Sequence, residues 1–481
     1  MKKQNHVSEK RKRRRKKNER KAIILAVLVV ISVIALAVTL AAFVFKADFF
    51  VGKNREEQKN RQENDAQPEI EVTVEDATNQ SDRGGELDDA DLGQTDGSNP
   101  DQPDRSTVQK DENVEVLQDV TMIFAGDICF YDAYANMTAL RARGGKIESC
   151  IDEKLLAEMK AADICMVNNE FAYSDRGTPL ADKAFTFCSK PSNVSLLHDM
   201  GVDLVSLANN HVYDYGPDAL LDTLDTLKNA DIPYVGAGRD LSEASAVYYF
   251  EKNGRRIAFV SATQVERNEH PDTKGATDTT PGTFRCYTKD EFERLTAVIR
   301  EADAQADLTV VYVHWGTENT DELHWAQIEQ APQIVEAGAD LIIGDHPHCL
   351  QNVEYLNGVP VIYSLGNFWF NSKTLDTCLF KVIYRTDGKL DCRLIPAKQH
   401  DCRTDMETGS EKQRILDYMQ CISPNVTFDQ DGNITNTPYT GPKIDYDAVE
   451  RVPDPPAAAT PLPAADPASP VPDNITPVPV Q

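Results

Sequence analysis

Two histidines stand at a position in the chain where metal chemistry is expected. His346 and His348 follow the short apolar run 341–343 and flank Pro347. The apolar run is typical of a buried strand, and alternate residues of an extended segment point to the same side. Open α/β sheets build their sites beyond the carboxyl ends of their strands, and imidazole suits divalent transition metals. The pair therefore indicates a metal site at the end of this strand.

The same pattern recurs at four other places along the chain. Each of four further apolar runs ends in a metal-capable or acidic side chain: Asp127, Glu170, Asn210 with His211, and His314. Any one of these has an ordinary structural explanation, such as a turn or a helix cap. Five such strand ends in one domain favour a shared site. Carboxylates, an amide and imidazoles suit a centre for two metal ions, where a nearby histidine can protonate a leaving group.

The elements that must position these residues are predicted by the apolar pattern. Strands and helices alternate from residue 119 to about 344, and strands dominate after that. Thr386-Asp387-Gly388 lies between two apolar runs and predicts a β-hairpin. The chain is therefore expected to form a layered α/β sandwich with mixed, largely parallel sheets. Parallel strands would bring the candidate ligands to one edge.

The two ends of the chain differ in composition from the middle. Residues 1–21 hold 12 Lys and Arg, and residues 22–45 carry no charge and are long enough to span a bilayer. The positive-inside rule places the N-terminus in the cytoplasm and the later domain outside the cell, on a single-pass anchor in the cell membrane. Residues 46–115 are expected to be an acidic disordered linker, 116–425 the folded domain, and 426–481 a Pro/Ala-rich disordered tail.

The overall charge and the cysteines narrow the classes of partner. The net charge is −27, from 77 acidic and 50 basic residues. Because the basic residues at the N-terminus offset part of this charge, the outer part is more acidic still, which argues against a nucleic-acid partner. The ten cysteines show no zinc-finger spacing. An outer location permits disulfides, and Cys392 with Cys402 is one possible pair.

Six motifs, in this order along the chain, resemble those of the CapA family of poly-γ-glutamate capsule synthesis proteins: GD (126–127), NNE (168–170), ANNHVYDYG (208–216), HWGTE (314–318), GDHPHCLQ (344–351) and SLGNF (364–368). The resemblance covers roughly residues 118–400. It implies a fold similar to the calcineurin-like metallophosphatases and a centre for two divalent transition-metal ions (Mn, Zn or Fe). It also implies a membrane-anchored protein of capsule biosynthesis.

The metallophosphatase pattern, carried over residue by residue, implies a role for each motif residue. The ligands would be Asp127 and His348 for the first ion, Glu170 as the bridge, and Asn210, His314 and His346 for the second. His211 would be the acid that protonates the leaving group. The chain departs from the pattern at Glu170, where an aspartate is usual, and at Cys129, where a histidine is usual. Cys129 is either a thiolate ligand or a buried apolar side chain.

Four further motif residues each have two interpretations. Asp214 either supports His211 or caps the following helix. Glu318 either orients a histidine or is a solvated loop acid. Gln351 and Asn367 either line the substrate cleft or satisfy loop backbone groups.

Two other pairs of residues are candidates for contact with a substrate. Arg176 and Lys183 follow Glu170 in the chain and either attract an anionic substrate or are ordinary surface charges. His324 and Trp325 stand before a predicted helix and are candidate contacts at the rim of the site.

Two functions fit these expectations. The first is a membrane-anchored, extracellular, metal-dependent hydrolase that acts on a phosphoester or similar anionic group in an envelope polymer or its precursor. The second is a non-catalytic subunit of a poly-γ-glutamate synthesis and export complex, which binds the emerging anionic polymer beside the membrane subunits of a capsule synthase. Only the hydrolase requires His211 or another acid.

Overall fold

The computed structural model of the protein describes residues 117–181, 183–265 and 274–450. The predicted membrane segment, the basic residues before it and the acidic linker lie outside these residues, so their structure stays a prediction. Within the described ranges, no helix combines the length and the apolar character needed to cross a membrane.

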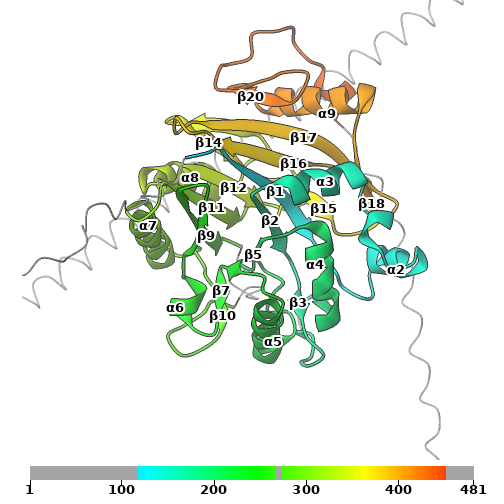
Figure 1. Ribbon diagram of the computed structural model, residues 1–481, viewed down its shortest axis with the longest axis vertical. Helices are drawn as coiled ribbons and strands as arrows, with labels where there is room; N and C mark the ends of the chain where they lie inside the picture. Colours follow the sequence, from blue (N-terminus) through cyan, green and yellow to red (C-terminus); the bar gives the residue numbers. More distant parts are fainter. Residues whose placement is uncertain (1–116, 182, 266–273, 451–481) are drawn as a thin grey trace, which may run out of the picture. The chain divides into compact units, whose positions relative to one another are not determined.

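Two β-sheets face each other within the domain (Figure 1). The larger sheet has the order β19 (Thr427–Phe428), β20 (Asn433–Thr435), β17 (Leu390–His400), β16 (Leu375–Tyr384), β1 (Val120–Ile128), β2 (Ile164–Asn169), β5 (Leu204–Ser206) and β6 (Tyr234–Val235), with β15 (Asn367–Trp369) beside β1 and β18 (Arg403–Met406) beside β17. The strands β1, β2, β5 and β6 run parallel. The hairpin predicted around residues 386–388 is confirmed, because β16 and β17 pair antiparallel on either side of it.

The smaller sheet has the order β13 (Val353–Leu356), β14 (Val359–Ile362), β12 (Leu341–Asp345), β11 (Leu308–His314), β9 (Arg255–Thr263) and β8 (Tyr248–Lys252). Its four central strands run parallel, and β8 and β13 are antiparallel edges. Two short pairs stand apart: β7 (Ala237–Gly238) with β10 (Gly282–Thr283), and β3 (Ala172–Tyr173) with β4 (Cys188–Ser189). Both sheets are therefore mixed, and the expectation of largely parallel sheets holds best near the candidate ligands.

Alternation of apolar side chains along the strands explains why the two sheets stack. Met122 and Phe124 of β1, and Val310 and Tyr312 of β11, all point into one core between the sheets. The residues between them in sequence point to the opposite faces, where they pack in two outer cores. Strands that are apolar on both faces must be covered on both sides, so each sheet needs an outer layer of helices.

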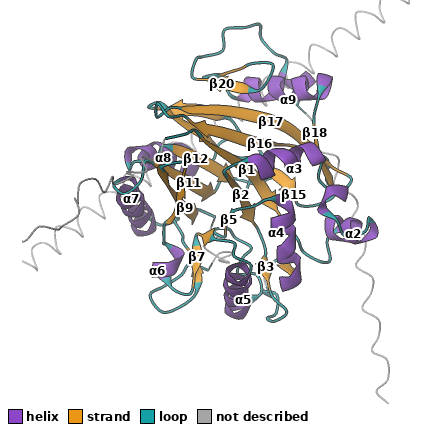
Figure 2. Ribbon diagram, viewed as in Figure 1, coloured by secondary structure: helices purple, strands orange, loops and turns teal. Residues whose placement is uncertain are grey.

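The helices form these outer layers, as Figure 2 shows. Over the larger sheet lie α2 (Ala135–Ala142), α3 (Glu153–Ala161), α4 (Ser195–Met200) and α5 (Gly216–Asn229), and over the smaller sheet lie α6 (Leu241–Ala244), α7 (Lys289–Asp303) and α8 (Trp325–Glu336). Near the end of the domain, α9 (Gly409–Ile422) packs on β17 and α10 (Tyr446–Val449) packs on α9. The order helix, sheet, sheet, helix confirms the predicted layered α/β fold.

The folded part continues past residue 425, where the sequence predicts a disordered tail. β20 pairs with β17, and Val426, Ile434 and Val449 are buried in the core between the sheets. The three elements after residue 425 are two, three and four residues long. Such short segments among polar residues carry too little apolar periodicity to be predicted from sequence.

Candidate metal centre

The parallel strands of both sheets direct the predicted site residues to one place. In chain order, Asp127 lies in β1, Glu170 follows β2, Asn210 and His211 follow β5, His314 ends β11, and His346 and His348 follow β12. The register sets His314 opposite Asp345 across β11 and β12. The carboxyl ends of parallel strands share one edge of their sheet. The two sheets stack so that Asp127 of the larger sheet contacts His348, which lies 221 positions later and follows a strand of the smaller sheet.

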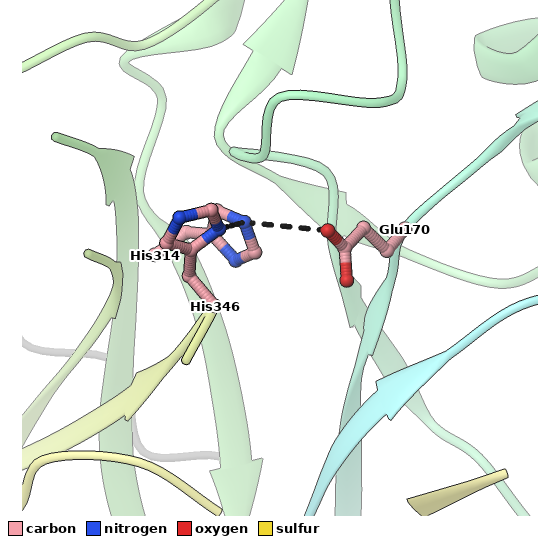
Figure 3. Close-up of side chains that lie close together, drawn as sticks. All are labelled: Glu170, His314 and His346. Atoms are coloured by element: carbon pink, nitrogen blue, oxygen red, sulfur yellow. Dashed lines mark hydrogen bonds and ion pairs between the residues drawn. The ribbon is translucent and has the colours of Figure 1, made fainter. Parts of the chain in front are cut away.

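Two groups of potential ligands meet at Glu170. One group is Glu170, His314 and His346, and the other is Asp127, Glu170 and His348; the ligand atoms within each group all lie within 4.8 Å of one another. Figure 3 shows the Glu170 carboxylate pointing toward the two imidazoles of the first group. Because Glu170 belongs to both groups, it occupies the position of a bridging ligand.

Glu170 is a buried acid without hydrogen-bond compensation. The residue is fully buried, and neither carboxylate oxygen has a hydrogen-bond partner among the described residues. Burial raises the pKa of Glu170 well above its ordinary value, and the charges of Asp127, Asp345 and Glu318 raise it further. Since a buried, unpaired carboxylate is costly, a bound cation would supply the missing compensation. The donor set of carboxylates and imidazoles therefore fits a divalent metal ion.

The side-chain amides of two asparagines contact the ring of His314. Its Nε2 lies 2.9 Å from Oδ1 of Asn210 and 3.5 Å from Oε1 of Glu170. Its Nδ1 lies 3.2 Å from Nδ2 of Asn168. Burial lowers the pKa of His314 well below its ordinary value, and His346, whose Nδ1 is 3.1 Å from Nε2 of His314, lowers it further. A neutral ring is the form of histidine that binds metals.

The histidine His348 faces the other side of the centre. Its Nδ1 lies 3.1 Å from Oδ2 of Asp127 and 2.8 Å from Oδ1 of Asn367. Burial acts to lower the pKa of His348, but the bond to Asp127 and its charge raise it more, so the net shift is upward. Asn367 thus contacts a candidate ligand. This contact explains the position of its side chain without a hydrogen bond to the backbone of a loop.

The backbone at the two histidines that follow β12 differs from the extended form that the sequence suggests. His346 has φ of +101° and His348 has φ of +57°. Positive φ is uncommon outside glycine, so residues 346–348 form a turn and the two side chains do not share one side of a strand. The turn sends His346 to the group with His314 and His348 to the group with Asp127.

His211 stands beside the two groups without belonging to either. Its Nδ1 lies 2.7 Å from Oδ2 of Asp214, and its Nε2 lies 3.8 Å from Oε1 of Glu170. Its ring packs against Phe187 at a centroid distance of 4.2 Å. Burial lowers the pKa of His211, although Asp214 raises it in part. The ring therefore presents one nitrogen to the centre while Asp214 holds the other.

Asp214 contacts His211, as the first of its two interpretations requires. It is fully buried and also accepts a hydrogen bond from the backbone N–H of Phe187 at 2.7 Å. Lys183 completes the arrangement, with its Nζ 2.6 Å from Oδ1 of Asp214 and a second bond to the carbonyl of Asn210. Lys183 is therefore a buried partner of Asp214 rather than a surface charge. Arg176 instead pairs with Asp222 at 2.5 Å, on α5.

Three remaining candidates lie outside the ligand groups. Gln351 accepts a bond from Gln327 and donates to the carbonyl oxygens of residues 320 and 322, so it satisfies loop backbone. Glu318 is exposed and acts on Glu170 through its charge. Cys129 is buried in the core between β1 and the helices, where burial raises the pKa of its thiol well above the usual range. Its apolar surroundings favour the interpretation as a core side chain.

The cysteines that the sequence suggests as a pair do not meet. Cys392 is buried between the two sheets, and Cys402 lies on the turn that follows β17. All ten cysteines fall within the described residues, and all are free thiols.

Three polar residues of the centre are not singled out by the sequence. Asp345 is fully buried and bonded to the hydroxyl of Tyr312, and burial together with Asp127 raises its pKa well above the ordinary value. Asn209 donates to Oδ1 of Asn168 at 3.0 Å and accepts a bond from the N–H of His211. Asn168 and Asn209 both lie in the motifs named above. The two consecutive asparagines in each of these motifs are the sequence signal that could have identified them.

Comparison with known proteins agrees with the motifs. The profile of a family described as bacterial capsule synthesis protein PGA_cap matches residues 121–372, a little over half of the chain. The chain belongs to this family. The matched residues contain every candidate ligand of the centre.

Two relatives are similar to about half of the chain. The PGA biosynthesis protein CapA of Bacillus subtilis (strain 168) is 33% identical over 241 residues, which are 49% of this chain and 61% of that protein. The capsule biosynthesis protein CapA of Bacillus anthracis is 33% identical over 240 residues, 49% of this chain and 57% of that protein. The chain thus spans about three fifths of the length of these relatives. A crystal structure of a hypothetical protein from Thermus thermophilus aligns with 58% of this chain and 99% of its own, at 16% identity and a TM-score of 0.34, too weak a likeness to carry an argument.

Proposed function

We propose that the domain is a metal-dependent hydrolase of phosphoesters or similar anionic groups, with a fold and centre of the calcineurin-like metallophosphatase type. The observation that carries this proposal is the state of Glu170. It is fully buried, its two carboxylate oxygens have no hydrogen-bond partner among the described residues, and it is shared by two groups of metal-capable side chains. A purely structural site would leave the cost of that buried acid unexplained.

The residues fit two divalent transition ions, such as Mn, Zn or Fe. One ion would be held by Asp127, Glu170 and His348, and the other by Glu170, Asn210, His314 and His346. Bound ions of this kind stabilise charge on phosphoryl oxygens and activate water for attack.

The side chain of His211 would supply the proton to the leaving oxygen. Asp214 fixes the ring through Nδ1, which leaves Nε2 directed at the centre. A carboxylate in this position orients the imidazole and stabilises its protonated form. Lys183 and the Phe187 N–H in turn hold Asp214 in place. The orientation of the His211 ring is therefore fixed by contacts outside the ligand groups.

The proposed setting is the outer face of the cell membrane. It is supported by the uncharged segment 22–45 behind 12 basic residues and by the capsule and PGA biosynthesis named for the two relatives. The substrate would be an envelope polymer or its precursor, and membrane subunits of a capsule synthase are the proposed neighbours.

Metal analysis beside an activity assay tests the proposal. We expect the full chain to bind about two transition-metal ions and to hydrolyse p-nitrophenyl phosphate or its bis-ester. Glu170→Gln should lose metal and turnover together, whereas Asp222→Asn, which alters the surface pair with Arg176, should retain both. Bound metal without turnover after addition of manganese or zinc would contradict a hydrolase and favour a polymer-binding subunit.

A further inference from the structure

A cavity of about 360 Å³ opens beside one half of the centre. Asn210 and His346 line it, so it is continuous with the ligand group that contains His314. Its other walls come from the loop after β9, the segment before α7, the loop after β11 and the start of α8. A group attached to a phosphoryl moiety at the metal centre would extend into this cavity.

The described residues that line the cavity carry a net negative charge. Glu318 is the only acid among these described residues, and none of them is a lysine or arginine. Burial lowers the pKa of His324, another lining residue, and so disfavours the charged form of its ring. Glu318 is close enough to the centre to raise the pKa of both Glu170 and His348. An anionic group in the cavity would therefore be repelled by the Glu318 carboxylate, and no described lining residue offers it a cation, which disfavours a poly-γ-glutamate chain as the occupant.

The cavity wall offers unused hydrogen-bonding groups. The side chains of Gln264, Tyr287 and Thr317 line it, and none of the three bonds to another side chain or carbonyl in the described ranges. Together they present an amide, a phenol and an aliphatic hydroxyl, each able to both donate and accept. A ligand that carries several hydroxyl groups would satisfy them without bringing charge.

The rim of the cavity carries an exposed aromatic ring. Trp325, the first residue of α8, is 51% exposed, and its indole stands 5.3 Å from the ring of His324 between centroids. The other two tryptophans, Trp315 and Trp369, are fully buried. Because a tryptophan joins a broad apolar face to a polar edge, it suits a ligand with one apolar face and a polar periphery. A pyranose ring has this shape.

We propose that this cavity binds the uncharged sugar ring of a sugar phosphate, stacked on Trp325 with its hydroxyls toward Gln264, Tyr287 and Thr317. The inference rests on the proposed phosphoester hydrolysis, because it assumes that the phosphoryl group lies at the metal centre. It narrows the substrate class to phosphoesters of neutral sugars. Glu318 then acts as a selectivity residue that rejects uronic acids and other anionic groups.

Fluorescence titration of the full chain tests the inference without metal or turnover. Trp325 is the exposed tryptophan of the three, so methyl α-glucoside should change the emission saturably, and methyl α-glucuronide should bind about tenfold more weakly. Glu318→Gln should remove most of that difference. Trp325→Ala should lose glucoside binding by calorimetry, while Ile328→Ala, which alters an exposed residue of the same helix outside the cavity lining, should keep it.

Two results would overturn the inference: no saturable response to the glucoside, or a glucuronide that binds as tightly as the glucoside. Because the titration needs no catalysis, its failure would leave the proposed hydrolase intact. Conversely, a chain that binds the glucoside but hydrolyses no phosphoester would retain the sugar site and lose the proposed reaction.

Discussion

Asp214 and His211 are joined by a 2.7 Å contact between Oδ2 and Nδ1, three positions apart in the chain. The contact is fixed from behind, because Lys183 and the N–H of Phe187 both bind the same carboxylate. The imidazole consequently has one free nitrogen, and that nitrogen faces Glu170. Such an arrangement directs the second ring nitrogen at the centre without using a metal ligand.

This relationship predicts that His211 can be removed without loss of metal. His211→Ala should lower the turnover of an aryl phosphate by about 10²- to 10⁴-fold, the usual contribution of general acid catalysis. Metal content, measured by elemental analysis of the same sample, should not change. His198→Ala is the matched control, since His198 is exposed on α4 and bonds only the carbonyl of residue 230. Full activity in the His211 variant would rule out the proposed acid.

A second prediction concerns the stability cost of Glu170. In a chelator, the wild-type protein must either bury an unpaired charge or take up a proton, and glutamine requires neither. Glu170→Gln should therefore stabilise the metal-free protein by about 1–3 kcal/mol. Metal at a hundred times its dissociation constant should stabilise the wild type by about 2.7 kcal/mol and the variant by much less. Urea unfolding with and without manganese measures both effects.

The control for this prediction is Glu293→Gln, which removes an acid of α7 that is 63% exposed and pairs with the exposed Lys289. It should leave the urea midpoint nearly unchanged under both conditions. A Glu170 variant that is less stable than the wild type in chelator would show that the acid is compensated within the protein, and the argument from its burial would fail.

The strand ends of the centre could be predicted from sequence because each follows a recognisable apolar run. Asp127 lies near the end of β1, Glu170 directly follows β2 and His314 ends β11, and these strands are buried over all or nearly all of their length. The carboxyl ends of parallel strands share an edge of their sheet, so the pattern groups Asp127 with Glu170, and the stacking of the two sheets brings His314 to them. The alternation of strands and helices likewise led to the layered fold.

Other parts of the centre depend on contacts that one sequence does not encode. Lys183 resembles any loop lysine, and only the burial of Asp214 beside it makes it internal. Asp345 looks like a strand-end residue, and its bond to Tyr312 depends on how β11 and β12 are aligned. The turn at His346 depends on a positive φ, which only a few per cent of residues other than glycine adopt.

The close approach of β1 and β15 gives a third prediction. The N–H of Asp127 bonds the carbonyl of Gly366 at 3.0 Å, and a Cβ at Gly126 would overlap that same carbonyl oxygen. Gly126→Ala must therefore push the strands apart, and it should destabilise the protein by about 3 kcal/mol. It should also weaken metal binding, because Asp127 moves with the strand. Urea unfolding and elemental analysis measure the two losses.

The matched control is Gly358→Ala on the turn between β13 and β14. Gly358 has φ of +91° and no neighbour within 4 Å of an added Cβ. Its substitution costs only the strain of a left-handed residue, about 1–2 kcal/mol, and should not affect metal. Equal losses of stability in Gly126→Ala and Gly358→Ala would mean that the strands can move apart at Gly366 with little cost in free energy.

The last prediction concerns pH and the start of α7. Glu291 accepts hydrogen bonds from the N–H of Thr288 at 2.9 Å and from Nε of Arg285 at 2.9 Å. Burial acts to raise the pKa of Glu291, but the Thr288 N–H and the Arg285 charge lower it more, so the folded pKa is depressed. A depressed pKa contributes stability that is complete above the unfolded pKa of about 4.3 and is lost as the pH falls through the folded pKa.

Glu291→Gln should accordingly reduce the free energy of unfolding by about 1 kcal/mol at pH 7. The gap between the variant and the wild type should narrow as the pH is lowered from about 5 to about 3, because the wild-type carboxylate then becomes neutral as well. Urea titrations across this range measure the gap. Glu293→Gln in the same helix is the control, since Glu293 is 63% exposed and pairs only with the exposed Lys289; it should show little effect at any pH. A gap for Glu291 that stays constant with pH would mean that packing, rather than charge, accounts for its contribution.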